Sequence, residues 1–138
     1  SIYQRFRDEL VSRARALKPG DPSLEGTAQG AIVSKQHFDK VCSYIELARQ
    51  EGGKILCGGP VKLDKRCKEG WFIEPVIIEN LHNHCRTNQE EIFGPLVTLQ
   101  PFDTEQEALD LANDTEYGLA CSVWSMQHQM LVTFDNEG

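Results

Sequence analysis

The residues best suited to chemistry are two acids and an aromatic ring in the segment 89–96 of this 138-residue chain. The segment has the sequence Gln-Glu-Glu-Ile-Phe-Gly-Pro-Leu, so Glu90 and Glu91 stand just ahead of Phe93. A carboxylate can accept a pair of hydrogen bonds from vicinal hydroxyls, as on a ribose. An aromatic face can support a flat heteroaromatic ring. The Gly-Pro pair then marks a turn before an apolar strand, and loops at strand ends commonly carry function in α/β sheets.

A simpler interpretation competes with this one. The spacing alone is more typical of two surface charges, Glu90 and Glu91, beside a core residue, Phe93. The second candidate site is His82, His84 and Cys85, which could in principle bind a metal. Their spacing fits no standard zinc pattern, so a polar connecting loop is the favoured interpretation and no metal site is predicted.

Composition and cysteine usage narrow the class of protein. The formal net charge of −7 disfavours nucleic-acid binding, because phosphate backbones would be repelled. No apolar run approaches the ~20 residues of a membrane helix, and no targeting segment is visible. The chain has five cysteines, an odd number, and no two of them form a Cys-x-x-Cys pair. This pattern argues against a disulfide framework or a zinc site and favours reduced thiols in a cytoplasmic protein. They are Cys42, Cys57, Cys67, Cys85 and Cys121.

The hydrophobic pattern predicts the elements that must position segment 89–96. Apolar residues at helical spacing predict a helix over 2–17 and another after Ser34, which can cap it. A charged surface loop is expected over 60–70. Further along, Thr104 and Glu107 form a capping box in front of a helix that ends near residue 113. Strands are expected at 54–57, 71–78, 96–99 and 118–124, and a last helix is expected from residue 125.

This order predicts an α/β fold. The second half of the chain alternates strands and helices, which implies right-handed crossovers between parallel strands. We therefore expect three layers, with a mostly parallel sheet flanked by helices on both faces. Pro75 lies inside the 71–78 strand and cannot donate to a ladder, so this strand should be an edge or irregular stretch.

Several segments together resemble the aldehyde dehydrogenase superfamily. They occur in the family's order and cover nearly the whole chain, which makes the combination specific although each segment alone is weak. The segments are Ile-Tyr-Gln-Arg-Phe at 2–6, Gly-Gly-Lys-Ile-Leu-Cys-Gly-Gly at 52–59, Gly-Trp-Phe-Ile-Glu-Pro at 70–75, Glu-Glu-Ile-Phe-Gly-Pro at 90–95, Ala-Asn at 112–113 and Tyr-Gly-Leu-Ala at 117–120. Two departures are Val76, where the family pattern has Thr, and the stretch 84–89, where many members carry a Met.

The resemblance implies that residues 1–138 are an incomplete part of the family's catalytic domain, with the dinucleotide-binding domain absent from this chain. It implies NAD or NADP as cofactor. The second Glu of the motif, here Glu91, would hold the nicotinamide ribose hydroxyls, and Phe93 would lie against the nicotinamide. Gly94 and Pro95 would shape the turn that presents them, with Glu90 in a supporting role.

The family reaction, as the resemblance implies it, oxidises a small-molecule aldehyde to a carboxylic acid through a cysteine thiohemiacetal and thioester. None of the five cysteines matches the place of the family's nucleophile, and no residue matches its Glu base. The isolated chain is therefore expected to be inactive and to hold no catalytic residue. The alternative is a truncated, non-catalytic form that acts as an interaction or oligomerisation partner.

The resemblance also suggests substrates and assembly. Within the family, the chain is most similar to members that act on muconic semialdehydes, betaine aldehyde or similar small polar aldehydes. Family members assemble as dimers or tetramers, so a homo-oligomer is expected. Neither nucleic acid nor a membrane is expected as a partner.

Overall fold

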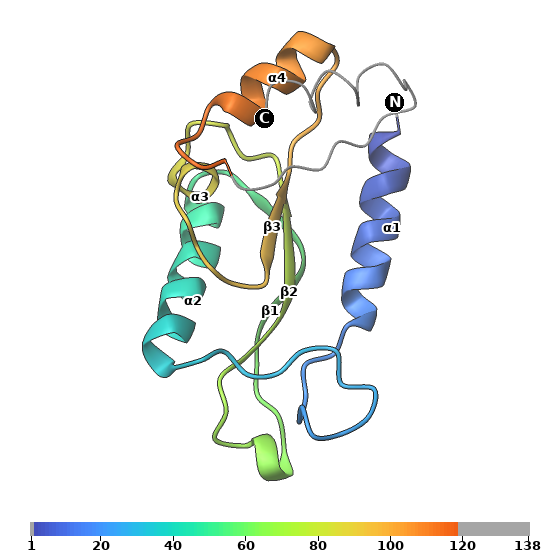
Figure 1. Cartoon of the computed structure of the whole chain (residues 1–138), viewed down its shortest axis with the longest axis vertical. Coiled ribbons are helices and arrows are strands. Elements are labelled where there is room, and N and C mark those ends of the chain that lie inside the picture. The colour runs from blue at the N-terminus through green and yellow to red at the C-terminus, as the bar shows by residue number, and fades with distance from the viewer. Residues whose placement is uncertain (1, 119–138) are drawn as a thin grey trace.

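A computed structural model describes residues 2–118 and shows a small sheet between two long helices (Figure 1). Helix α1 (Tyr3–Ala16) covers one face of the sheet and α2 (Lys35–Gln50) covers the other. The α/β class with helices on both faces is thereby confirmed. The predicted strand at 118–124 and the helix after it extend beyond the described residues.

Three strands form the sheet in the order β1-β2-β3. They are β1 (Lys54–Val61), β2 (Phe72–Glu79) and β3 (Leu96–Leu99). Strand β2 pairs antiparallel with β1 and parallel with β3, so the described part of the sheet is mixed. The parallel β2–β3 pair confirms the parallel pairing expected in the second half of the sequence.

Two of the helices begin at the capping residues that the sequence indicates. The side chain of Ser34 accepts a hydrogen bond from the His37 amide at 3.1 Å, as expected of the α2 cap. Gly52 follows α2 with a φ of 89°, a conformation that glycine adopts without steric cost. Helix α4 (Glu105–Asn113) begins with Thr104 accepting from the Glu107 amide at 3.1 Å. The Glu107 carboxylate reaches back to the amide of Asp103, so the expected capping box closes one residue early.

Two short helices occur in connections that carry no helical periodicity. One is η1 (Lys65–Cys67) in the charged connection between β1 and β2. The other is α3 (Arg86–Gln89), which directly precedes the Glu-Glu motif. Within residues 2–118, no helix combines the length and apolar character needed to cross a bilayer.

Strand β2 is the central strand, so the expectation that Pro75 marks an edge was wrong. The alternative expectation, an irregular stretch, is confirmed by shifts in the β1–β2 register between Ile55 and Cys57 and again between Cys57 and Gly59. Opposite Pro75, Gly58 takes a φ of 81°. A Cβ at Gly58 would lie 2.0 Å from the Pro75 carbonyl oxygen. The β1 bulge around Gly58 thus lies opposite Pro75, which has no amide hydrogen to donate. Pairing resumes beyond the bulge, so β1 extends to Val61 and does not end at residue 57 as expected.

The main hydrophobic core lies between α2 and the sheet. Nearly every residue of β2 is buried, as expected of a strand covered on both faces. The core includes Ile92, which belongs to the Glu-Glu motif and therefore ties that segment to the fold. Its buried members are Val41, Ile45, Ala48, Ile73, Val76, Ile78, Leu81 and Ile92.

A buried carboxylate joins α1 to the sheet. Glu79, only 4% exposed, accepts a hydrogen bond from the Tyr3 hydroxyl at 3.1 Å. Arg7 and Lys54 lie 3.5 Å and 3.2 Å from its carboxylate oxygens. Desolvation opposes ionisation, but these cationic and hydroxyl partners outweigh it and lower the pKa of Glu79.

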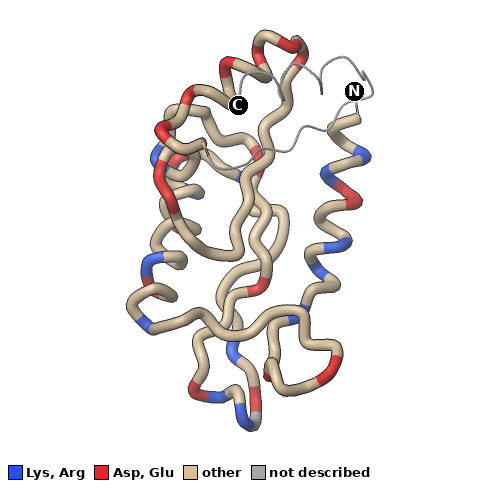
Figure 2. The backbone as a smooth tube through the Cα atoms, viewed as in Figure 1, with Lys and Arg blue, Asp and Glu red and all other residues tan. Residues whose placement is uncertain are grey.

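Figure 2 shows the contrast between the many basic residues along α1 and the acidic residues along α4.

We predict that Gly58→Ala destabilises the chain by more than about 3 kcal/mol, because the new methyl group would overlap the Pro75 carbonyl. Gly52→Ala is the matched control: it has a similar φ of 89° but open space around it, so it should cost only about 1 kcal/mol. Urea unfolding followed by circular dichroism measures both. Equal losses in the two variants would show that the close approach at Pro75 is not constraining.

Candidate cofactor-contacting loop

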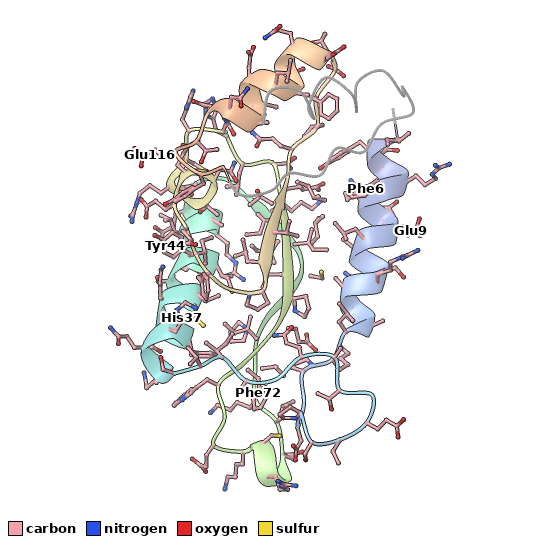
Figure 3. All side chains as sticks on the ribbon, viewed as in Figure 1. Phe6, Glu9, His37, Tyr44, Phe72 and Glu116 are labelled. Carbon is pink, nitrogen blue, oxygen red and sulfur yellow. The ribbon has the colours of Figure 1, made fainter. Side chains whose placement is uncertain are left out.

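The segment 86–95 runs back along α2 in the opposite chain direction before entering β3 (Figure 1). Its last residues therefore lie at the amino-terminal end of β3, whereas α3 lies beside the carboxyl end of α2. The polar residues His37, Lys40 and Tyr44 of α2 meet this segment, and His37 and Tyr44 lie about two helical turns apart (Figure 3). The loop is thus held by a single helix at successive positions.

The first contact fixes the start of α3. The carboxylate of Glu51, the residue that follows α2, accepts hydrogen bonds from the amides of Arg86 and Thr87 at 2.9 and 3.2 Å. It also accepts from the Thr87 hydroxyl at 2.6 Å. Amides at the first turn of a helix have no partner within the helix, so Glu51 supplies the acceptor that α3 lacks.

The second contact surrounds Glu90. Arg86 donates from Nε and Nη2 to the two Glu90 carboxylate oxygens, at 2.5 and 3.0 Å. The Tyr44 hydroxyl donates a short hydrogen bond to the same carboxylate. Arg86 first, and then Tyr44, stabilise the charged form and lower the pKa of Glu90 to about 2. The same bond raises the pKa of Tyr44. Glu90 therefore anchors the loop and is not a free surface charge.

The third contact holds the backbone of Glu91 and leaves its side chain open. Lys40 Nζ donates to the Glu91 carbonyl oxygen at 2.8 Å. The Glu91 side chain is exposed, and no group within residues 2–118 bonds to its carboxylate. Both carboxylate oxygens thus remain available as acceptors.

The fourth contact holds Phe93, a residue that is 77% exposed. Its φ of 59° lies in the left-handed region that a bulky residue rarely adopts. The Phe93 carbonyl lies 2.5 Å from His37 Nε2, which must carry the proton because a carbonyl only accepts. The His37 ring also meets the Phe93 ring edge-on, with centroids 6.1 Å apart. Such strain persists only where surrounding contacts determine the backbone, and it clusters at functional sites.

Packing completes the attachment between these polar contacts. Ile92 is buried, at 9% exposure, against the α2 side of the core. A Cβ on Gly94 would lie 2.7 Å from a methyl carbon of Val41, so only glycine allows this close approach. Pro95 then accepts a hydrogen bond from the Val76 amide at 2.8 Å, and the chain enters β3.

The structure places both predicted site residues, Glu91 and Phe93, on the surface of one loop, two positions apart. The competing interpretation was wrong for Phe93, because the buried residue of the motif is Ile92. Sequence reasoning missed the α2 residues that hold the loop. The available signal was that His37, Lys40 and Tyr44 flank the apolar stripe of α2 at spacings of three and four residues.

The hollows and histidines elsewhere in residues 2–118 offer weaker candidates for a functional site. A hollow of about 730 Å³ lies between α4 and the loop that bears His82 and His84, and another of about 480 Å³ lies beside α1. Neither is lined by Glu91 or Phe93. No cluster of three or more potential metal ligands is found within residues 2–118. His84 instead pairs with Asp114, with Nδ1 3.0 Å from the carboxylate.

Comparison with known proteins decides the family. The model of the aldehyde dehydrogenase family matches residues 1–137. The chain belongs to the aldehyde dehydrogenase family. The sequence resemblance is thereby confirmed, and the loop described above corresponds to the Glu-Glu-Ile-Phe-Gly-Pro motif on which that resemblance depended.

The aldehyde dehydrogenase relatives include 4-trimethylaminobutyraldehyde dehydrogenase A of Danio rerio, which is 44% identical over 126 residues. That match covers 90% of this chain and 25% of the relative. The 5-carboxymethyl-2-hydroxymuconate semialdehyde dehydrogenase of Escherichia coli is 45% identical over 128 residues, covering 91% of this chain and 27% of the relative. The chain therefore spans about a quarter of the length of these aldehyde dehydrogenases.

Solved aldehyde dehydrogenase structures share the fold. Betaine aldehyde dehydrogenase from Staphylococcus aureus, solved in complex with NAD+, matches with a TM-score of 0.88 and 39% sequence identity. The match covers 98% of this chain and 27% of that chain.

We predict that Glu90→Gln flattens part of the acid dependence of stability. The pKa of Glu90 is depressed in the fold, so its ionised form contributes stability that is fully present above the unfolded pKa of about 4.3. That contribution is lost as the pH falls towards the folded value of about 2. Because Arg86 and Glu90 are partly exposed, water screens their contact, so the difference between the urea midpoints of wild type and variant should be small at neutral pH. That difference should disappear as the pH is lowered through this window. Parallel pH profiles would show that the Arg86–Glu90–Tyr44 contacts do not stabilise the charged carboxylate.

Proposed function

We propose that this chain supplies the nicotinamide-facing loop of an NAD-dependent aldehyde dehydrogenase, which oxidises an aldehyde to a carboxylic acid. The observation that carries the proposal is that part of the loop is bonded to α2 while two of its side chains remain exposed. On the side that faces α2, the Glu90 carboxylate and the Glu91 and Phe93 carbonyls are hydrogen-bonded. The Glu91 carboxylate, by contrast, has no partner within residues 2–118, and Phe93 is exposed. The NAD+ complexes of the similar betaine aldehyde dehydrogenase support NAD as the cofactor.

The two open groups fit the cofactor chemically. The Glu91 carboxylate has the acceptors that two vicinal ribose hydroxyls require, and charge-assisted hydrogen bonds are the stronger kind. The Phe93 ring offers an exposed aromatic face to a flat nicotinamide. NAD, when bound, supplies the acceptor for the hydride removed from the substrate. The chain's own contribution is to bind and orient that acceptor, and orientation can contribute several kcal/mol to a transfer reaction.

Three of the four cysteines within residues 2–118 lie in surroundings that do not suit a nucleophile. Catalytic cysteines react as thiolates in environments that lower the thiol pKa. Burial instead raises the pKa of Cys42 and Cys85. Cys57 is half-buried, with its thiol 3.6 Å from the Pro75 carbonyl. We therefore propose that the nucleophile and the general base lie outside residues 2–118, and that the 138-residue chain alone does not turn over aldehydes.

The substrate is proposed to be a small polar aldehyde, and the assembly a homo-oligomer. The names of the relatives support the first point, because they refer to trimethylammonium-bearing, carboxylated and betaine aldehydes. Family resemblance supports the second.

The test compares Glu91→Gln with wild type in a polypeptide of full family length that contains this segment. Replacing the carboxylate with an amide should raise KM for NAD roughly tenfold, because a charge-assisted contact to the ribose is lost. KM for the aldehyde should change little. Glu25→Gln, an exposed acid in the loop between α1 and α2, is the matched control and should match wild type.

Two results would contradict the proposal. An unchanged KM for NAD in Glu91→Gln would remove the cofactor contact from this residue. NAD-dependent oxidation of betaine aldehyde by the isolated 138-residue chain would show that the catalytic groups lie within it.

A further inference from the structure

The Glu90 carboxylate lies one residue before Glu91 and is held from two different elements. Arg86 reaches it from α3 through a two-pronged contact, and Tyr44 reaches it from α2. Both carboxylate oxygens are therefore occupied within the chain. A carboxylate has about four acceptor sites, and three of those on Glu90 are filled within the chain, so Glu90 is better suited to holding the loop than to binding a ligand.

Glu90 is also the residue at which the chain leaves α3. Its amide donates to the Arg86 carbonyl at 2.9 Å, while its φ of −110° and ψ of 143° are extended. The peptide that follows leads directly to Glu91, whose carbonyl is fixed by Lys40. The Cα of Glu91 is thus held on its amino side by the Glu90 contacts and on its carboxyl side by Lys40.

We propose that Arg86 and Tyr44 are positioning residues for the cofactor contact of Glu91: by holding both carboxylate oxygens of Glu90, they fix the backbone from which Glu91 projects. The inference rests on the function proposed above. It assigns a role to two residues that do not themselves contact the cofactor.

A purely stabilising role is a weaker explanation of the cluster. Arg86 is largely exposed, and exposed ion pairs contribute little to global stability because water screens them. Helix α2, which bears Tyr44, carries a comparable exposed pair, Arg49 with Glu46 at 3.0 Å. What distinguishes the Glu90 cluster is the added Tyr44 bond and its place next to Glu91. Its expected effect is therefore on orientation more than on unfolding.

The experiment uses Tyr44→Phe and Arg86→Gln in the family-length polypeptide, with Arg49→Gln as the matched control. Equilibrium binding of NADH, followed by its fluorescence, measures the effect without turnover. We expect each loop variant to weaken binding roughly three- to tenfold, the range typical of one lost hydrogen bond, with little change in melting temperature. Tyr44→Phe removes one hydroxyl only and should fold. The control should bind NADH as wild type does.

A cofactor-free measurement tests the same idea in the resting protein. Hydrogen exchange at the amides of residues 91–94 should be faster in Tyr44→Phe and Arg86→Gln than in wild type or Arg49→Gln, because the loop loses its anchor. Unchanged exchange in this loop, together with wild-type NADH binding, would overturn the positioning role.

Combination with Glu91→Gln separates this inference from the proposed function. If Tyr44 acts through Glu91, Tyr44→Phe should weaken NADH binding no further in the Glu91→Gln background. A full additional loss there would overturn the inference while leaving Glu91 as a cofactor ligand. Failure of Glu91→Gln alone to affect NADH binding would instead overturn the proposed function.

Discussion

The antiparallel attachment of segment 86–95 to α2 is the constraint on which the candidate site depends. Contacts recur along the helix and its end in reverse chain order: Glu51 holds the start of α3, Tyr44 holds Glu90, Lys40 holds the Glu91 carbonyl and His37 holds the Phe93 carbonyl. These contacts lie along one side of a single helix and its end, so the loop is held at four points along its length. The backbone of the loop is thereby held in place as firmly as that of a helix or strand.

This attachment explains how the loop can carry strain and open groups together. Phe93 keeps a left-handed backbone because His37 holds its carbonyl and Gly94 fits closely against Val41. The ring itself stays exposed, and so does the neighbouring Glu91 carboxylate. An exposed aromatic ring and an unpaired acid contribute little to folding, which is consistent with the ligand-binding role that we propose for them.

Much of this arrangement was predictable from the sequence. The α2 helix followed from its apolar stripe and its Ser34 cap, and β3 followed from its apolar run after Gly-Pro. The pairing of Glu91 with Phe93 as site residues came from the family motif; spacing alone favoured the wrong burial for Phe93. The contacts from α2 were not predictable, because they join residues about fifty positions apart and depend on the register between a helix and a loop. The position of the loop also departs from the usual rule for α/β sheets, since it precedes β3 and does not follow it.

The central claim is that the open side of this loop meets the nicotinamide end of NAD. The most direct measurement is the nuclear Overhauser effect between the Phe93 ring, isotopically labelled, and the nicotinamide protons of NAD+ in a family-length polypeptide. The account predicts cross-peaks from Phe93 to the nicotinamide ring, which disappear when a competing dinucleotide displaces NAD+. Saturation with NAD+ that leaves the Phe93 resonances unmoved and without cross-peaks would contradict it.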